Sequence, residues 1–458
     1  MAKVEKLSFG IELEFYIAWR AAAFNGTVPT PPGPRSGPGA GPLVIRARRP
    51  KGNDIIYTLA SIIDEAFPSP AGTVASSGGG GSGNGEGLGR LMHYQRWAVE
   101  PDSTLDTLPQ ELEDQTNQYF GWAGVELVSP ALWATQEAFE EVRKVCEFLQ
   151  KRFWMVSDPQ AGFHIHVGSG SAWPPLNSLR QIAALIYAAD PILAQSHPPH
   201  RRNNIWCTSI RLYSNLSFGL RRLSTEDRPI PGRLEDEEER PVYATGYTRI
   251  AELPQNPFRH ILSNTKPASN GLDRSKNQFP PRPSESVYHI DNEVARIIRL
   301  SHGPFIKEAQ QTSAYEPIPM MTAVAQILQS PNMGAIAGLL GVGERRGAYN
   351  FWQLDRDVKR TIEFRQAAST VDPVEVIAYT RIAIRLFEFG ASASPEELLK
   401  VILDCEMAEE EPAWFDLYDL LHELDLLPEA KIVQAVLSGN MTHAIRKEYW
   451  LSRGHRVG

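Results

Sequence analysis

The stretch Phe9-Gly10-Ile11-Glu12-Leu13-Glu14-Phe15 alternates apolar and acidic residues after its glycine. In a β-strand, successive side chains point to opposite faces. Ile11 and Leu13 are therefore predicted to face a core, and Glu12 and Glu14 to lie side by side on the other face. Neighbouring carboxylates repel each other, which a fold tolerates in water or with a cation between them. The stretch alone fits either a solvated edge strand or part of a cation site.

Three later stretches repeat this pattern of a strand with ionisable residues in it. They are AGVELVSP at 123–130, GFHIHVG at 162–168 and TIEFRQ at 361–366. Their ionisable members are Glu126, His164, His166, Glu363 and Arg365. If the four strands share one sheet, one face collects carboxylates, imidazoles and a guanidinium. Oxygen ligands with imidazole suit Mg²⁺ or Mn²⁺, and arginine suits a phosphate or carboxylate held through two hydrogen bonds.

Bulk composition limits the classes of protein that are possible. The chain has 458 residues, of which 42% are hydrophobic and 22% charged, as in ordinary globular proteins. A net charge of −8 argues against a general nucleic-acid binder. No apolar run approaches the roughly 18 residues that span a membrane, and residues 1–6 lack an apolar signal core. Three distant cysteines without a CxxC pair fit the reducing cytosol, so a cytoplasmic protein is expected.

Coarse secondary structure follows from periodicity and from breaker residues. Helical spacing predicts helices over 54–67, 136–153, 176–189, 285–300 and 370–389. A strand over 349–354 is predicted to form a hairpin with the strand that carries Glu363. These elements predict an α+β fold, with an antiparallel sheet flanked by helices.

Runs of proline, glycine, serine and acidic residues predict surface insertions. They lie at about 25–90, which includes one helix, at 223–242 and at 264–285. The remainder divides into a main domain over 1–390 and a helical segment over 391–458 packed on it.

Two more residues are candidates because of where they lie in the chain. Asp102 follows a predicted strand, at a position where loops often contact substrate. The alternative is an Asx-turn, in which Asp102 caps local backbone amides. Arg201 belongs to a basic stretch over 197–211 that fits either a phosphate or acidic ligand, or a solvated loop.

Taken together, these motifs resemble the amidoligases of fungal type, within the glutamine synthetase and glutamate–cysteine ligase fold. The resemblance rests on FGIELEF at 9–15, GVELVSP at 124–130, GFHIHVG at 162–168, and TIEFR at 361–365 followed by Ser369 and Thr370. Each motif alone is weak, but their order and composition together are fairly specific. The insertions between them carry no part of the resemblance.

The resemblance implies a curved antiparallel sheet whose concave face binds ATP, divalent cations, and the acid and amine substrates. It implies one metal set of Glu12, His166 and Glu363 near the nucleotide phosphates. A second set of Glu14 and Glu126 lies nearer the substrate carboxylate, where glutamine synthetase has three glutamates. Asp102 or water would complete that second set.

Further roles also follow from the resemblance. Arg365 resembles an arginine that stabilises the transferred phosphoryl group. His164 resembles a nucleotide-side or supporting residue, and Asp102 is placed for a contact with the substrate amine. The carboxylates of Glu126 and Asp102 are expected to be catalytic together with Arg365. Arg201 is a further candidate for cofactor binding.

The implied activity is an ATP- and Mg²⁺-dependent ligase that joins a small carboxylate to an amine through an acyl phosphate. The sequence lacks both the glycine-rich P-loop and a nucleophile-elbow serine, so nucleotide is expected to bind on the sheet. Two alternatives remain open. One is an inactive relative that binds a small molecule. The other is a cupin-type metal oxygenase built on His164, His166 and a carboxylate, although no glutamate follows His166 within a few residues.

Overall fold

The chain forms two compact units, which we call the sheet unit and the helical unit. The sheet unit comprises Glu5–Trp173, Ala367–Ile384 and Ser438–Gly458. The helical unit comprises Met1–Val4, Pro174–Gln366 and Arg385–Leu437. This computed structural model describes residues 6–24, 39–47, 50–68, 94–202, 204–222, 247–249, 271–285, 317–342, 347–355 and 359–454.

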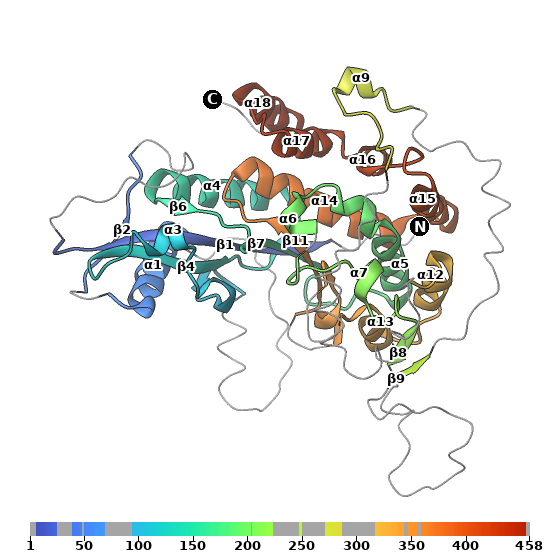
Figure 1. The fold of residues 1–458 in the computed structure, drawn as a ribbon, viewed down its shortest axis with the longest axis horizontal. Helices are drawn as coiled ribbons and strands as arrows, with labels where there is room; N and C mark the ends of the chain where they lie inside the picture. The colour runs from blue at the N-terminus through green and yellow to red at the C-terminus, as the bar shows by residue number, and fades with distance from the viewer. Residues whose placement is uncertain are drawn as a thin grey trace, which may run out of the picture. The chain divides into compact units, whose positions relative to one another are not determined.

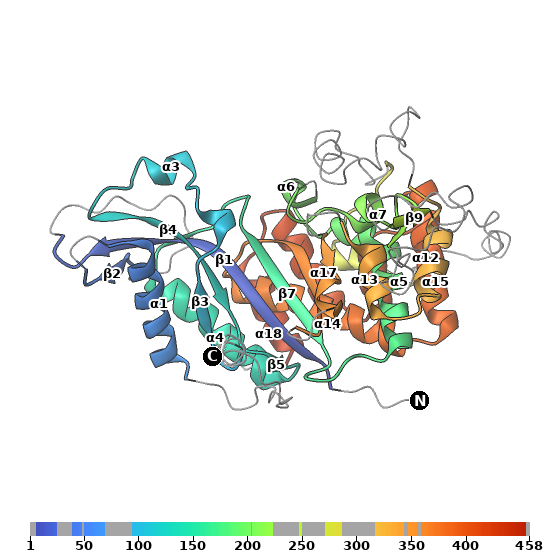
Figure 2. The ribbon, with the colours of Figure 1, turned by 90° about the horizontal axis from the view of Figure 1, so that it is seen from below.

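The centre of the sheet unit is a long strand, β1 (Ser8–Ala21), which contains the acidic stretch. Figure 2 shows β1 between two antiparallel neighbours, β4 (Phe120–Val128) and β7 (Gly162–Gly168). Strand β3 (Ala98–Glu100) pairs with β4, and β5 (Leu132–Trp133) and β6 (Met155–Val156) add short antiparallel pairs to β1. The pairing of β1 with β2 (Leu43–Ile45) is parallel.

One face of β1 packs on a helix. The apolar residues of the acidic stretch are buried on this side, and Phe9 stacks on Phe139 of α4 (Gln136–Arg152) with ring centroids 5.2 Å apart. Figure 1 shows α4 lying along the strands. Thr135 caps the start of α4. The buried residues of this helix recur at helical spacing and face the sheet.

The opposite face of β1 is polar at one end and apolar at the other. Beyond the glutamates, Tyr16 and Ala18 join a small core with Phe120 and Trp122 of β4. Leu105 of the 3-10 turn η1 (Ser103–Leu105) and Leu112 of α3 (Gln110–Glu113) cover this core. The loop after β3 is thereby held beside the acidic end of the strand.

The remaining elements of the sheet unit are helical. Helix α1 (Gly52–Ala66) buries Ile55, Leu59 and Ile63 and contacts β2 and β3. Helix α18 (His443–Ser452) lies near α4, where Arg143 approaches the ring of Trp450.

The helical unit is built around α5 (Leu176–Ala194), which contacts α7 (Ile210–Tyr213), α12 (Met320–Leu328), α13 (Met333–Leu340), α15 (Pro395–Glu410) and α16 (Leu417–Glu423). Its other elements are α6 (Pro199–Arg202), β8 (Leu220–Arg222), β9 (Tyr247–Arg249), α9 (Arg274–Asn277), β10 (Tyr349–Asn350), η2 (Trp352–Asp355) and α17 (Leu427–Leu437). Strand β11 (Thr361–Ala368) and helix α14 (Pro373–Ser392) run from one unit into the other along the chain.

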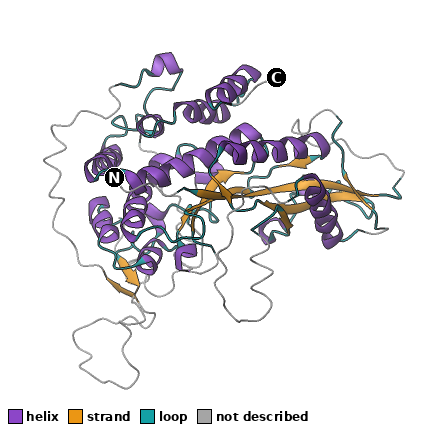
Figure 3. Ribbon diagram, turned by 180° about the vertical axis from the view of Figure 1, so that it is seen from behind, coloured by secondary structure: helices purple, strands orange, loops and turns teal. Residues whose placement is uncertain are grey.

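The expected fold class is confirmed. The chain is mixed α+β, with an open, mainly antiparallel sheet that includes the parallel β1–β2 pair and is flanked by helices (Figure 3). The pairing of β10 with β11 forms as predicted, but the strand predicted over 349–354 was too long: β10 ends at Asn350, and Trp352–Asp355 form the 3-10 turn η2. Strand β2 was not predicted, because it is short and lies inside the presumed insertion 25–90. Two predicted segments fall outside the described residues. They are the acidic run at 223–242 and the helix over 285–300, of which only Glu285 is described.

Within the described part of the chain, no helix combines the length and the apolar character that a membrane crossing requires.

Candidate functional site

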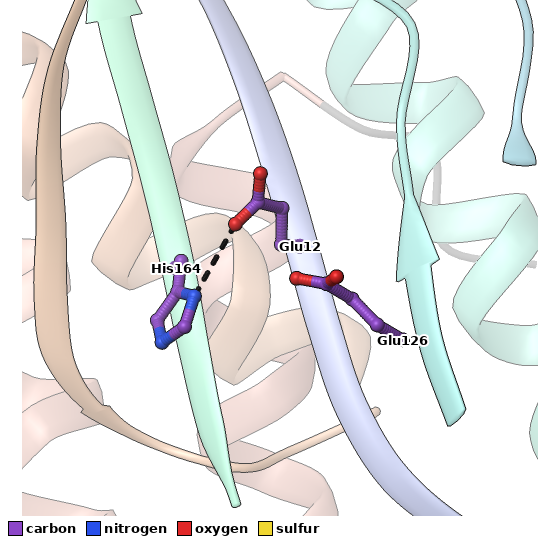
Figure 4. Close-up of side chains that lie close together, drawn as sticks. All are labelled: Glu12, Glu126 and His164. Carbon is purple, nitrogen blue, oxygen red and sulfur yellow. Dashed lines mark hydrogen bonds and ion pairs between the residues drawn. The ribbon is translucent and has the colours of Figure 1, made fainter. Parts of the chain in front are cut away.

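Three neighbouring strands bring two glutamates and a histidine together in the sheet unit. Glu12 lies on β1, His164 on β7 and Glu126 on β4 (Figure 4). In the β1–β7 register Glu12 stands directly opposite His164, and in the β1–β4 register Glu14 stands opposite Glu126. Residues directly opposite each other in a sheet share a face. The register therefore places all four side chains on one face of the sheet.

The donor atoms of this cluster are close enough to share an ion. Glu12, Glu126 and His164 each offer one ligand atom within 4.8 Å of the other two. Nδ1 of His164 lies 3.3 Å from Oε2 of Glu12, and Nε2 of the same ring lies 3.3 Å from Oε1 of Glu14. Nε2 of His166 lies 2.9 Å from the other oxygen of Glu12. The imidazole of His164 thus bridges the two carboxylates that alternation in β1 places side by side.

Glu14 is further held by the main chain of β7. The backbone N–H of Gly162 donates to Oε2 of Glu14 at 2.5 Å. Glu12, Glu14, His164 and His166 are all buried, whereas Glu126 is only partly buried. Buried carboxylates this close to one another are stable only when hydrogen bonds, protons or a cation offset their repulsion.

The pKa of Glu126 reports this repulsion. This pKa rises to about 10, chiefly through burial and then through the charges of Glu12, Glu14, Asp102 and Glu100, in that order of importance. A divalent cation beside these groups would favour the ionised form. Two carboxylates with an imidazole form a donor set that suits Mg²⁺ or Mn²⁺.

Sequence reasoning missed Glu100. This residue is opposite Glu126 in the β3–β4 register, so Glu14, Glu126 and Glu100 form a row across three strands. Its local sequence, WAVE at 97–100, has a single acidic residue and no repeat to attract notice. The only sequence signal for Glu100 was its place in a predicted strand. The partner that this strand sets opposite Glu100 is visible only in the tertiary structure.

Asp102 caps local backbone amides, which was the alternative to a substrate contact that its sequence context left open. Its Oδ1 accepts the N–H of Thr104 at 2.7 Å, so the carboxylate caps the turn η1. The same residue lies near enough to the site to influence Tyr16, whose pKa rises to about 12 through burial and through the charges of Asp158, Asp102 and Glu14. A contact between Asp102 and a substrate amine stays a prediction.

Two predicted site residues, Glu363 and Arg365, belong to the helical unit. The guanidinium of Arg365 pairs with the carboxylate of Glu363, which also accepts Nδ2 of Asn350 at 2.7 Å. Nε of Arg365 donates to the carbonyl oxygen of Trp206 at 3.4 Å. Both side chains are buried. The predicted metal set of Glu12, His166 and Glu363 spans both units and stays a prediction.

Arg201 is buried in the helical unit and contacts the main chain of β11. Its guanidinium donates to the carbonyl oxygens of Arg365 at 2.7 Å and Gln366 at 3.3 Å. At 1% exposure, the side chain supports the strand that carries Arg365. A direct contact between Arg201 and a cofactor stays a prediction.

The model of a family described as "Putative amidoligase enzyme" matches residues 57–217. Part of this chain is similar to amidoligases. The matched segment, about a third of the chain, contains Asp102, Glu126, His164, His166 and Arg201. Glu12, Glu14, Glu363 and Arg365 lie outside it. Neither a curated protein nor a solved structure gives a significant match. The likeness to amidoligases indicates a ligase-type enzyme.

Proposed function

We propose that this protein is an ATP- and Mg²⁺-dependent carboxylate–amine ligase, of the fungal amidoligase type within the glutamine synthetase fold. The observation that carries the proposal is the cluster of Glu12, Glu126 and His164 on three adjacent strands. The likeness of residues 57–217 to amidoligases supports the same reading. Mn²⁺ would serve in place of Mg²⁺, because both ions prefer these donors.

The chemistry requires an activated acid, since joining a carboxylate to an amine in water is uphill. The substrate carboxylate attacks the γ-phosphorus of ATP, which forms an acyl phosphate and releases ADP. The amine then attacks the acyl carbon, the C–O bond to phosphate breaks, and inorganic phosphate leaves. The proton lost by the amine passes to a base, and the product is an amide.

In the sheet unit, the carboxylates of Glu12 and Glu126 and the imidazole of His164 would hold the divalent ion. Glu14 and Glu100 extend the same acidic row. A bound divalent ion neutralises charge on the phosphate oxygens as the phosphoryl group is transferred. His166 lies 2.9 Å from Glu12 and orients that carboxylate.

Two further side chains have roles in the proposal. Arg365 would stabilise the transferred phosphoryl group through its planar guanidinium, which Glu363 holds in place. Asp102 or Glu126 would accept the proton from the attacking amine. In the absence of a P-loop sequence, nucleotide phosphates would bind to the polar face of the strands.

The proposal is tested by calorimetric titration of a non-hydrolysable ATP analogue into the full chain, with and without Mg²⁺. We expect binding that requires Mg²⁺ and that is lost in Glu12→Gln, because the neutral amide removes a charged ligand. Glu111→Gln is the matched control, since Glu111 is an exposed glutamate of α3 in the same unit. Binding without any divalent ion, or unchanged binding in Glu12→Gln, would reject the metal assignment.

A second measurement addresses the reaction itself. Formation of ADP from ATP is followed with candidate carboxylates, first alone and then together with an amine. A ligase of the proposed kind releases ADP at a steady rate only when both substrates are present. An equal rate of ADP release with and without the added amine would contradict the proposal.

A further inference from the structure

The acidic stretch of β1 lies where the ladders on both of its edges come to an end. On the β4 side, pairing stops at Glu12 opposite Val128, and on the β7 side it stops at Leu13 opposite Phe163. The main chain around the two glutamates therefore depends on other partners. Unpaired buried backbone groups are rare and costly, so the residues that supply these partners control where Glu12 and Glu14 lie.

On the β4 side, Ser129 supplies the partner. Its backbone N–H donates to the carbonyl oxygen of Ile11 at 2.8 Å, as a ladder residue would. The returning bond is different, because the N–H of Ile11 donates to Oγ of Ser129, also at 2.8 Å. The hydroxyl replaces a main-chain carbonyl as acceptor, and it donates in turn to the carbonyl oxygen of Pro130 at 2.9 Å. The chain can thus leave the sheet at Pro130, which has no N–H of its own, while Ile11 stays paired.

On the β7 side, Ser369 has the complementary role. Its hydroxyl donates to the carbonyl oxygen of Glu14, and its backbone N–H donates to the carbonyl oxygen of Ala161 at 3.3 Å. The N–H of Gly162, the residue after Ala161 and the first of β7, donates a hydrogen bond to the carboxylate of Glu14. Both serines are buried, at 2% and 5% exposure, so water cannot substitute for either hydroxyl.

We propose that Ser129 and Ser369 are positioning residues that hold the main chain of β1 between Ile11 and Glu14. The two hydroxyls act on opposite edges of the strand, one as an acceptor and the other as a donor. Together they fix the backbone from which the carboxylates of Glu12 and Glu14 reach His164. The inference rests on the proposed metal-dependent function, because its consequence is a preorganised ligand set.

The test compares Mn²⁺ affinity in variants of the full chain, measured by the electron paramagnetic resonance of free Mn²⁺. We expect Ser129→Ala to weaken binding by about 10- to 100-fold, as loss of a supporting hydrogen bond does at metal sites. Ser129→Thr keeps a hydroxyl and should restore most of the affinity. Ser369→Ala should resemble Ser129→Ala, and it carries the test if Ser129→Ala does not fold.

The matched control is Ser8→Ala. The hydroxyl of Ser8 also lies on β1 and accepts a backbone N–H, that of Gly170, at the same 2.8 Å. It lies at the start of the strand, away from Glu12. Loss of this bond should lower thermal stability and leave Mn²⁺ affinity unchanged.

The possible results separate the two claims. No Mn²⁺ binding by the wild-type chain would reject the proposed function, and this inference with it. Wild-type binding with unchanged affinity in both Ser129→Ala and Ser369→Ala would reject the inference alone. Equal weakening in Ser129→Ala and Ser8→Ala would also reject it, because the effect would then be general destabilisation.

Discussion

Glu126 has more acidic neighbours than strand alternation alone would provide. Alternation in β1 explains why Glu12 and Glu14 are adjacent, and that much follows from seven residues of sequence. The approach of Glu126 and Glu100 follows instead from the pairing of β4 with β1 and of β3 with β4. The site is therefore a product of register, which a local pattern does not specify.

At this scale we predict the effect of Glu126→Gln on the metal-free protein. The raised pKa of Glu126 means that folding near neutral pH adds a proton to this carboxyl, at a cost in stability that Gln does not carry. The melting temperature of the variant without divalent ions should therefore be higher by a few degrees. Wild-type protein should gain stability when Mg²⁺ is added, and the variant should not. Both effects are measured by thermal unfolding followed by circular dichroism. Glu111→Gln, on the exposed surface, should behave like the wild type, and an equal Mg²⁺ response in Glu126→Gln would contradict the prediction.

Among the elements, the turn η1 is placed by a glycine in β4. A Cβ on Gly124 would lie 2.3 Å from Cβ of Leu105 and 2.7 Å from its carbonyl oxygen. Both distances are far below van der Waals contact, so only glycine lets η1 pack this closely on the strand. The glycine of the GVELVSP motif thereby positions Asp102, which caps η1, beside the acidic row.

We therefore predict that Gly124→Ala displaces η1 and destabilises the sheet unit by about 1–3 kcal/mol, the usual cost of overpacking. Urea unfolding measures the loss. Gly41→Ala serves as the control, because nothing lies within 4 Å of its added Cβ and it precedes a strand of the same sheet. Equal stability of the two variants would show that η1 adapts without cost.

For the chain as a whole, the helical unit contains acids whose pKa is raised by burial. The pKa of Asp404 on α15 rises to about 6, chiefly through burial. Its Oδ1 accepts Nε1 of Trp414 at 3.0 Å, and Oδ2 has no hydrogen-bond partner among the described residues. Asp190 on α5 shows the same rise to about 6 with the same main cause.

These shifts fix the sign of a pH dependence. In the unfolded chain Asp404 loses its proton near pH 3.8, and in the folded chain near pH 6. The folded state binds more protons at Asp404 between these values, so this residue lowers the stability of the wild type by up to about 3 kcal/mol as pH rises from about 4 to 6. Asp404→Asn removes this loss and keeps the acceptor for Trp414. It should be more stable than the wild type at pH 8 and similar to it at pH 4.

Urea unfolding at the two pH values measures this difference. Glu396→Gln, an exposed acid of the same helix, is the control and should show little change at either pH. If Asp404→Asn gave the same stability difference at pH 4 and pH 8, the buried acid would not be the cause.

The sequence by itself determined the strand character of the four motifs, the faces on which their charged residues lie and the mixed α+β class. Alternation and helical periodicity depend on neighbours in the chain, so they are visible without a fold. Only the tertiary structure decided that Glu100 joins the row and that β2 pairs with β1. It also decided that Asp102 caps a turn and that two serine hydroxyls hold the acidic stretch. The strand pairings depend on register, and the two serine contacts join segments more than a hundred residues apart. Short-range patterns do not encode such contacts.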